Sequence, residues 1–214
     1  MPEQTVISLG NNTDFFCWRI SETLDWGYNH IDLLPQEKKE WEAFHHARQR
    51  ELVFVRWAIQ SLFPGKNIIY DEHGKPYLED KSFEISISHT DNLVGIVRSD
   101  QPIGVDIEAH YKKCSRIYHK FLHPSEKLHL KPEDEDELGV AWCSKEAIYK
   151  AIGTKGTLFS EQIVLPTLAN LQGPQIGMAF LEEKNFEFDL YHGFLDGVPW
   201  AVARQNQVHE AIGI

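Results

Sequence analysis

Cysteine is scarce in this sequence: the 214 residues contain three, Cys17, Cys114 and Cys143, which lie far apart along the chain. This spacing offers neither a disulfide framework nor a CxxC metal motif, so we expect reduced thiols. Long apolar runs are missing too, and the first residues lack the basic-then-apolar pattern of a signal peptide. We therefore expect a cytoplasmic protein with no membrane partner.

Positive charge is also in deficit, with 21 Lys and Arg against 32 Asp and Glu and a net charge of −11 at pH 7. This balance argues against nucleic acid as a partner, because the contact surface of such proteins is basic. The acidic run over residues 133–137 predicts a solvated loop, and it lacks the glycine and the spacing of a calcium loop. His119 and His123 have an i,i+4 spacing that a metal could use, but no third ligand is evident nearby.

Helix followed by sheet is predicted twice, once on each side of residue 102. On the first side, a helical region runs from about Leu33 to Phe63 with a break near His45, and a hairpin covers residues 83–97. On the second, a helix over 142–152 ends at Gly153, and strands over 186–191 and 200–203 flank a turn at 196–197. We therefore predict an α+β fold of two similar halves, residues 1–101 and 102–214.

The chemistry centres on residues 102–108, where apolar residues at 103, 105 and 107 alternate with glycine or acid at 104, 106 and 108. This is the pattern of a strand with one buried face. Asp106 and Glu108 leave the same face, and they repel each other unless a cation or a shared proton lies between them. The alternative is a solvated edge that carries two exposed acids.

A third acid lies on the helix predicted over 142–152. Glu146 and Lys150 are one turn apart on the face opposite Ala147, Ile148 and Ala151. They are either a surface ion pair or a third carboxylate with a phosphate-facing lysine. In the same way, His89, at the end of a predicted strand, is either a structural histidine or a phosphate ligand.

A locally basic segment, residues 111–130, lies between the strand and the helix. Its cations alternate with apolar residues, as in an amphipathic helix or in a docking surface for an acidic partner. The cations are Lys112, Lys113, Arg116, Lys120 and Lys127.

Four motifs together resemble those of the 4′-phosphopantetheinyl transferase superfamily, and specifically its large surfactin-synthetase-type branch. The motifs are Gly74-Lys75-Pro76, Ile87-Ser88-His89-Thr90, the stretch 103–108, and Trp142-Cys143-Ser144-Lys145-Glu146 with Lys150. The resemblance covers about residues 35–165. It departs at Glu37 and Glu40, which stand roughly where the family has a basic residue, and in a Gly-x-Gly motif that is one residue longer here, at 153–156.

The resemblance implies a pseudo-dimeric fold, with the active site between two related halves, for which a monomer suffices. It implies transfer of phosphopantetheine from coenzyme A to a serine of an acyl or peptidyl carrier protein, which leaves adenosine 3′,5′-bisphosphate. Mg²⁺ would be held by Asp106, Glu108 and Glu146, with Glu146 also the candidate base, and the catalytic set is Asp106, Glu146 and Lys150. The residues expected to bind coenzyme A are Arg48, Arg50, Lys75, Ser88, His89 and Lys150.

Two other functions are compatible with the same residues. A metal-dependent phosphohydrolase would use the three carboxylates with water as the nucleophile. A coenzyme-A-binding or carrier-binding module would keep them only as structural acids.

Overall fold

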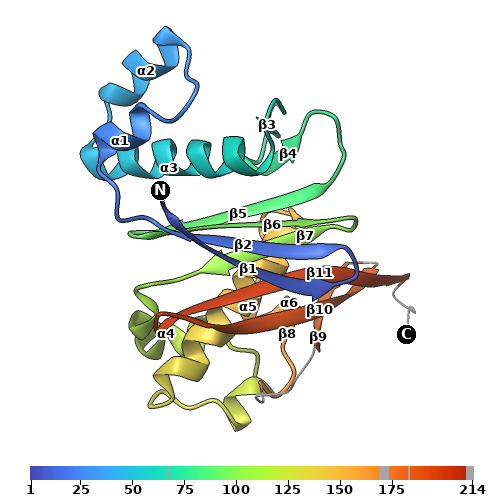
Figure 1. Cartoon of the computed structure of the whole chain (residues 1–214). Helices are drawn as coiled ribbons and strands as arrows, with labels where there is room; N and C mark the ends of the chain where they lie inside the picture. Colours follow the sequence, from blue (N-terminus) through green and yellow to red (C-terminus); the bar gives the residue numbers. More distant parts are fainter. Residues whose placement is uncertain (67, 169–173, 183, 211–214) are drawn as a thin grey trace.

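Two large antiparallel sheets form the centre of the computed structural model, which describes residues 1–66, 68–168, 174–182 and 184–210 (Figure 1). The first sheet, in the order β1-β2-β6-β5, contains β1 (Glu3–Gly10), β2 (Thr13–Arg19), β5 (Glu84–Thr90) and β6 (Leu93–Ser99). The second, in the order β7-β11-β10-β9-β8, contains β7 (Ile103–Ile107), β8 (Ile163–Val164), β9 (Gln175–Leu181), β10 (Lys184–Leu195) and β11 (Val198–Glu210). A small hairpin joins β3 (Ile68–Tyr70) to β4 (Pro76–Leu78). The predicted mixture of helices and sheets is confirmed.

Helices cover the outer side of each sheet (Figure 1). With the first sheet lie α1 (Leu24–Tyr28), α2 (Pro35–Glu42) and α3 (His46–Leu62). With the second lie α4 (Cys114–Phe121), α5 (Glu135–Ile152), α6 (Phe159–Gln162) and two 3₁₀ turns, η1 (Tyr111–Lys113) and η2 (Glu126–Leu128). The predicted break between α2 and α3 is confirmed, and so is the end of α5 at Gly153, whose φ of 70° is left-handed.

Buried side chains fill three interfaces, so the layers run helix, sheet, sheet, helix. One cluster, with Trp18, Phe54 and Trp57, packs α3 against the first sheet. A second, with Ile148 and Phe188, packs α5 against the second sheet. The third joins the inner faces of the two sheets through Phe15, Val105, Trp200 and Val202.

The two sheets also meet edge to edge, along β5 and β7, a contact that we call the seam. The unpaired edge of β7 points its amides at β5, where the Ser86 hydroxyl accepts from Val105 N and the Ser88 hydroxyl from Ile107 N, both at 3.1 Å. Side-chain oxygens thus replace the backbone carbonyls that a continuous sheet would supply. The seam fixes the position of β7, an edge strand of the second sheet, against β5, an edge strand of the first sheet.

Two predictions about local structure are wrong. All five residues of β7 are buried, rather than one face alone, because α5 covers the side of Gly104 and Asp106. The acidic run is only partly a loop: Glu135, Asp136 and Glu137 form the first turn of α5, where negative charge is favoured by the helix dipole. Helix α1 and strands β8 and β9 were not predicted.

The strands of the first sheet all precede residue 100 and those of the second all follow residue 102. The division into two related halves at residues 101 and 102 stays a prediction. No helix in the described ranges is both long enough and apolar enough to cross a membrane.

The close approach of β7 to α5 predicts that Gly104→Ala destabilises the protein. A Cβ at this position would collide with the backbone carbonyl of Ala147 and lie 2.7 Å from the nitrogen of Ala151. Since backbone atoms cannot turn aside as a side chain can, we expect a loss of about 2–3 kcal/mol in the free energy of unfolding, measured with urea. In the control Gly193→Ala, the new Cβ meets the Trp200 side chain at 3.2 Å, so the loss is smaller. Equal losses in the two variants would contradict the prediction.

Candidate functional site

Asp106 and Lys150, which are 44 residues apart, meet where β7 crosses α5. Oδ1 of Asp106 accepts hydrogen bonds from Lys150 Nζ at 2.8 Å and from the Ser88 hydroxyl at 3.1 Å. Lys150 Nζ also donates to the carbonyl of Val105 at 2.9 Å. The Asp106 residue is only 8% exposed, so this carboxylate needs these partners.

Glu108 follows directly after β7 and has its own cation. Its Oε2 pairs with Lys113 Nζ at 2.7 Å, and its Oε1 accepts from the amide of His110 at 2.8 Å. The hydrogen bond to Glu108 raises the pKa of Lys113. Each acid of this stretch is therefore balanced by a lysine.

Glu146, on α5, has the most perturbed carboxylate of the site. Burial is the main cause that raises its pKa to about 7, and the negative charges of Asp106 and Glu108 raise it further, while Lys150 and Lys113 act in the opposite direction. A carboxyl group with such a pKa can both hold and release a proton near neutral pH. The three acids thus act on one another electrostatically, although they come from two elements.

A metal site is not shown. Nowhere in the described parts of the chain do three or more His, Cys, Asp or Glu side chains gather closely enough to hold one ion, His119 and His123 included. The chemistry of the donor set nevertheless fits Mg²⁺, which prefers a few carboxylate oxygens together with substrate phosphates and water. Mutual repulsion among Asp106, Glu108 and Glu146 is what a bound cation relieves.

A cleft of about 580 Å³ opens beside Glu108 and contains three of the predicted coenzyme ligands, Arg48, Arg50 and His89. Arg50 is held in place, because its guanidinium donates to the carbonyls of Ile20 and Glu22 at 3.0 and 2.5 Å. Arg48 and His89 instead share a partner that was not predicted, Glu51, whose Oε1 lies 2.9 Å from His89 Nε2 and also pairs with Arg48 Nη1.

Lys75 lies elsewhere, in a smaller cleft of about 190 Å³ that it shares with Lys150 and Lys155. Its Nζ donates to the carbonyl of Ala151 at 3.2 Å, at the C-terminal end of α5. The predicted coenzyme ligands therefore form two groups. Ser88 belongs to neither cleft and instead supports Asp106.

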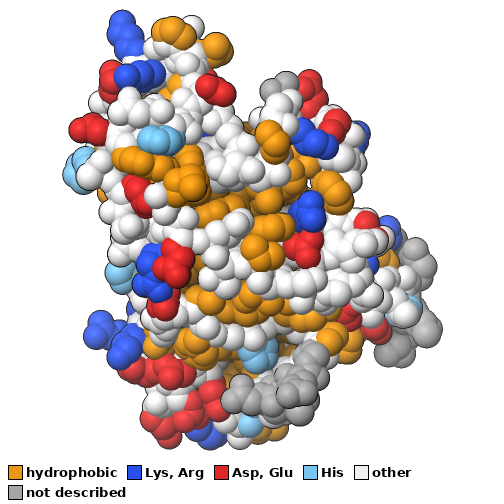
Figure 2. Space-filling view, viewed as in Figure 1, with side chains coloured by type: hydrophobic (Ala, Val, Ile, Leu, Met, Phe, Trp, Pro, Cys, Tyr) orange, Lys and Arg blue, Asp and Glu red, His pale blue; other side chains and the backbone are white. Residues whose placement is uncertain are grey.

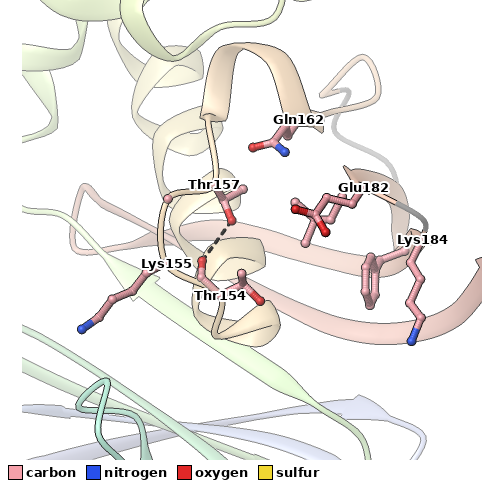
Figure 3. A pocket seen from close by; sticks show the side chains of 9 residues that line it. Thr154, Lys155, Thr157, Gln162, Glu182 and Lys184 are labelled. Atoms are coloured by element: carbon pink, nitrogen blue, oxygen red, sulfur yellow. Dashed lines mark hydrogen bonds between the residues drawn. The ribbon is translucent and has the colours of Figure 1, made fainter.

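Other hollows lie away from the three acids. One of about 410 Å³, between the loop after α5 and the β9–β10 hairpin, has Glu182 and Gln162 directed inward, while Lys155 and Lys184 point away (Figure 3). Another, of about 730 Å³, lies between the α2 region and β3–β4, where the surface in Figure 2 is hollowed and hydrophobic side chains are exposed. Neither contains a predicted site residue.

The match to a known family covers most of the second sheet together with α5 and the three acids. Residues 102–203 match the 4′-phosphopantetheinyl transferase superfamily. A 4′-phosphopantetheinyl transferase, gsp, of Aneurinibacillus migulanus is 33% identical over 110 residues, which are 48% of this chain and 46% of that protein. The chain thus spans about half the length of the curated relative it matches.

The resemblance to the 4′-phosphopantetheinyl transferase superfamily is thereby confirmed for the part of the chain that contains Asp106, Glu108, Glu146 and Lys150. The remaining predicted ligands precede the part that matches the superfamily. These are Arg48, Arg50, Lys75, Ser88 and His89.

Several residues that build the site were missed as functional residues. Lys145 and Glu126, both with fully buried side chains, form an ion pair at 2.8 Å, and Lys145 also donates to the carbonyls of Phe159 and Ile163. No sequence spacing connects these two positions. For Glu51, the i,i+3 spacing from Arg48 on a helix was an available signal, but its contact with His89 depends on the fold.

The raised pKa of Glu146 predicts that Glu146→Gln changes how stability depends on pH. The unfolded chain releases this proton near pH 4.5, whereas the folded protein keeps it until about pH 7. Between these values the folded protein binds more protons, so wild-type stability falls as the pH rises. The free energy of unfolding of Glu146→Gln, relative to that of wild type, should therefore increase by about 1–3 kcal/mol between pH 4.5 and pH 8. Urea unfolding in EDTA measures this.

The charge-matched control is Glu161→Gln, at an exposed position of α6. We expect its difference from wild type to stay constant over the same pH range. A constant difference for Glu146→Gln as well would contradict the prediction.

Proposed function

We propose that this protein transfers the phosphopantetheine group of coenzyme A to a serine hydroxyl of an acyl or peptidyl carrier protein. The observation that carries the proposal is the contact between Asp106 and Lys150, together with the influence of Asp106 and Glu108 on the pKa of Glu146, inside the segment that matches the superfamily. The name of the matched relative, a 4′-phosphopantetheinyl transferase, agrees with it. The active site lies between two related halves, and a cytoplasmic monomer is sufficient for the reaction.

Asp106, Glu108 and Glu146 are the residues that would hold Mg²⁺. Bound there, the ion would neutralise the diphosphate of coenzyme A. The effect of Asp106 and Glu108 on the pKa of Glu146 supports this assignment, because it indicates that the three carboxylates interact electrostatically. Lys150 and Lys113 balance two of these acids in the ligand-free protein.

The reaction needs a group that accepts the serine proton and basic side chains that bind the phosphates of coenzyme A. Glu146, with a pKa of about 7, takes the proton of the carrier serine. The serine oxygen then bonds to the phosphorus that bears pantetheine, and the bond to adenosine 3′,5′-bisphosphate breaks. Phosphoryl transfer of this kind depends mainly on position and charge. Lys150 and His89 face the diphosphate, while Arg48 and Arg50 lie toward the adenosine phosphates. Lys75 contacts the coenzyme from the smaller cleft that it shares with Lys150, and Ser88 orients Asp106.

The carrier docks on residues 111–130. Lys112, Arg116 and Lys120 are exposed there, and Leu128, 79% exposed, adds an apolar contact. Carriers of this class are expected to be acidic, so this surface complements them. The segment begins beside the site, because Lys113 binds Glu108.

Incubation of a purified apo carrier protein with this protein, coenzyme A and Mg²⁺ tests the function directly. Intact-mass measurement should show the gain of one phosphopantetheine, and EDTA should abolish it. Asp106→Asn and Glu146→Gln keep the side-chain shapes, and we expect each to lower the rate by about 100-fold or more with an unchanged circular dichroism spectrum. Lys150→Ala should also reduce turnover more than folding.

A folded Asp106→Asn or Glu146→Gln variant that loads the carrier at the wild-type rate would refute the assignment. Release of phosphopantetheine without a carrier would identify a phosphohydrolase instead. Binding of coenzyme A without either reaction would identify a binding module.

Charge reversal on the docking surface should affect the carrier alone. We expect Lys112→Glu combined with Arg116→Glu to raise the KM for the carrier by about tenfold, because two attractive charges become repulsive. The KM for coenzyme A should not change. Lys39→Glu, at an exposed position of α2, is the control. If both KM values rise together, the segment lines the coenzyme site and the docking proposal is wrong.

A further inference from the structure

Glu51 is one of the acids that line the 580 Å³ cleft. It projects from α3, and its side chain is 23% exposed. One of its oxygens, Oε1, lies 2.9 Å from Nε2 of His89, on β5, and also pairs with Nη1 of Arg48. The contact therefore joins two elements, unlike a pair within one helix.

Two other basic side chains that line the cleft, Arg50 and His110, have partners of their own. Arg50 is bound to two backbone carbonyls and lies over the ring of Phe54, with 4.8 Å between the guanidinium carbon and the ring centre. His110, on the opposite wall, pairs with Asp91 at 3.3 Å. Arg48 and His89 are thus the basic side chains of this cleft that share the Glu51 carboxylate, and a phosphate that enters the cleft could bind both in its place.

A carboxylate that binds an arginine and a histidine through one oxygen makes the same contacts as a phosphate oxygen. Burial lowers the pKa of His89, and Glu51 is the largest opposing influence. Any anion that enters the cleft has to displace Glu51 from these two groups or share them with it, and it meets the negative charge of Glu51 in either case.

We propose that Glu51 competes, from within the protein, with the ligand phosphate that binds Arg48 and His89. Glu51 would thereby lower the affinity for coenzyme A and speed the release of the bisphosphate product. This inference rests on the proposed function, since that function supplies the phosphorylated ligand. The alternative is a positioning role, in which Glu51 would orient Arg48 and His89 toward the ligand. In that case its removal would weaken ligand binding.

Isothermal titration of adenosine 3′,5′-bisphosphate and of coenzyme A, in EDTA, tests this inference without turnover. Glu51→Gln removes the charge and keeps the shape, whereas Glu51→Ala removes the acceptor as well. For both variants we expect the Kd of each ligand to fall by about three- to tenfold at low salt, as for the loss of one partly exposed charge near a phosphate. The gain should shrink at 0.5 M salt, because the interaction is screened.

Glu84→Gln is the matched control, since it removes the same charge at the opposite, exposed end of β5. We expect its Kd values to equal those of wild type. Unfolding midpoints confirm that the variants are folded. In steady state, competitive inhibition by the bisphosphate should strengthen in Glu51→Gln by the same factor as its Kd.

The outcomes separate the two proposals. If wild type binds coenzyme A and both Glu51 variants bind it equally or more weakly, the competitor role is wrong and the proposed function stands. If wild type binds neither ligand in EDTA or in a parallel titration with Mg²⁺, the proposed function fails and the inference fails with it.

Discussion

The contact on which the rest of the site depends is the pair of hydroxyl bridges along the seam. Ser86 and Ser88 satisfy two amides of β7 that its own sheet leaves open. An unpaired amide at this depth would cost about 1–3 kcal/mol, so the bridges are needed where they are. Ser88 then uses its proton for Asp106. One side chain thereby fixes the strand edge and orients the acid on it.

Charge in the site is balanced before any ligand arrives. Asp106 has Lys150, Glu108 has Lys113, and Arg48 has Glu51, while Glu146 avoids repulsion by keeping its proton until about pH 7. In the proposed reaction, each of these pairs would be exchanged for contacts with a ligand. The ligand-free state is therefore a set of provisional ion pairs, which is how a buried polar site can exist without large electrostatic cost.

The elements with strong local patterns could be predicted from the sequence, and the contacts between them could not. The alternation at 103–107, the turn at Asp196-Gly197 and the stop at Gly153 each express backbone preferences of a few adjacent residues. By contrast, short β8 has too few residues for a pattern. The acidic run over residues 133–137 was predicted as a loop because adjacent like charges repel one another. Three of these acids instead form the first turn of α5, where the helix dipole stabilises negative charge.

The same limit holds at the site. Asp106, Glu108, Glu146 and Lys150 were recognised together through motifs. The fold joins Asp106 to Lys150, and Asp106, Glu108 and Lys150 all influence the pKa of Glu146. Lys113, Glu51 and the Lys145–Glu126 pair depend on distances across elements, which no spacing encodes. Lys75 was predicted to bind the coenzyme with Arg48 and Arg50, but the fold places it in another cleft. The order of motifs along a sequence does not say which of them are neighbours in space.

The buried pair of Lys145 and Glu126 has a mechanical consequence. Glu126 also accepts hydrogen bonds from the amides of His123 and Leu165. Together with its ion pair to Lys145, these contacts connect α5 to the end of the basic segment and to the chain that follows α6. Neither charge can leave its partner without being stranded away from water, which makes sliding between these parts costly. The buried pair therefore resists changes in the distance between the segment proposed to receive a carrier and the helix that bears Glu146.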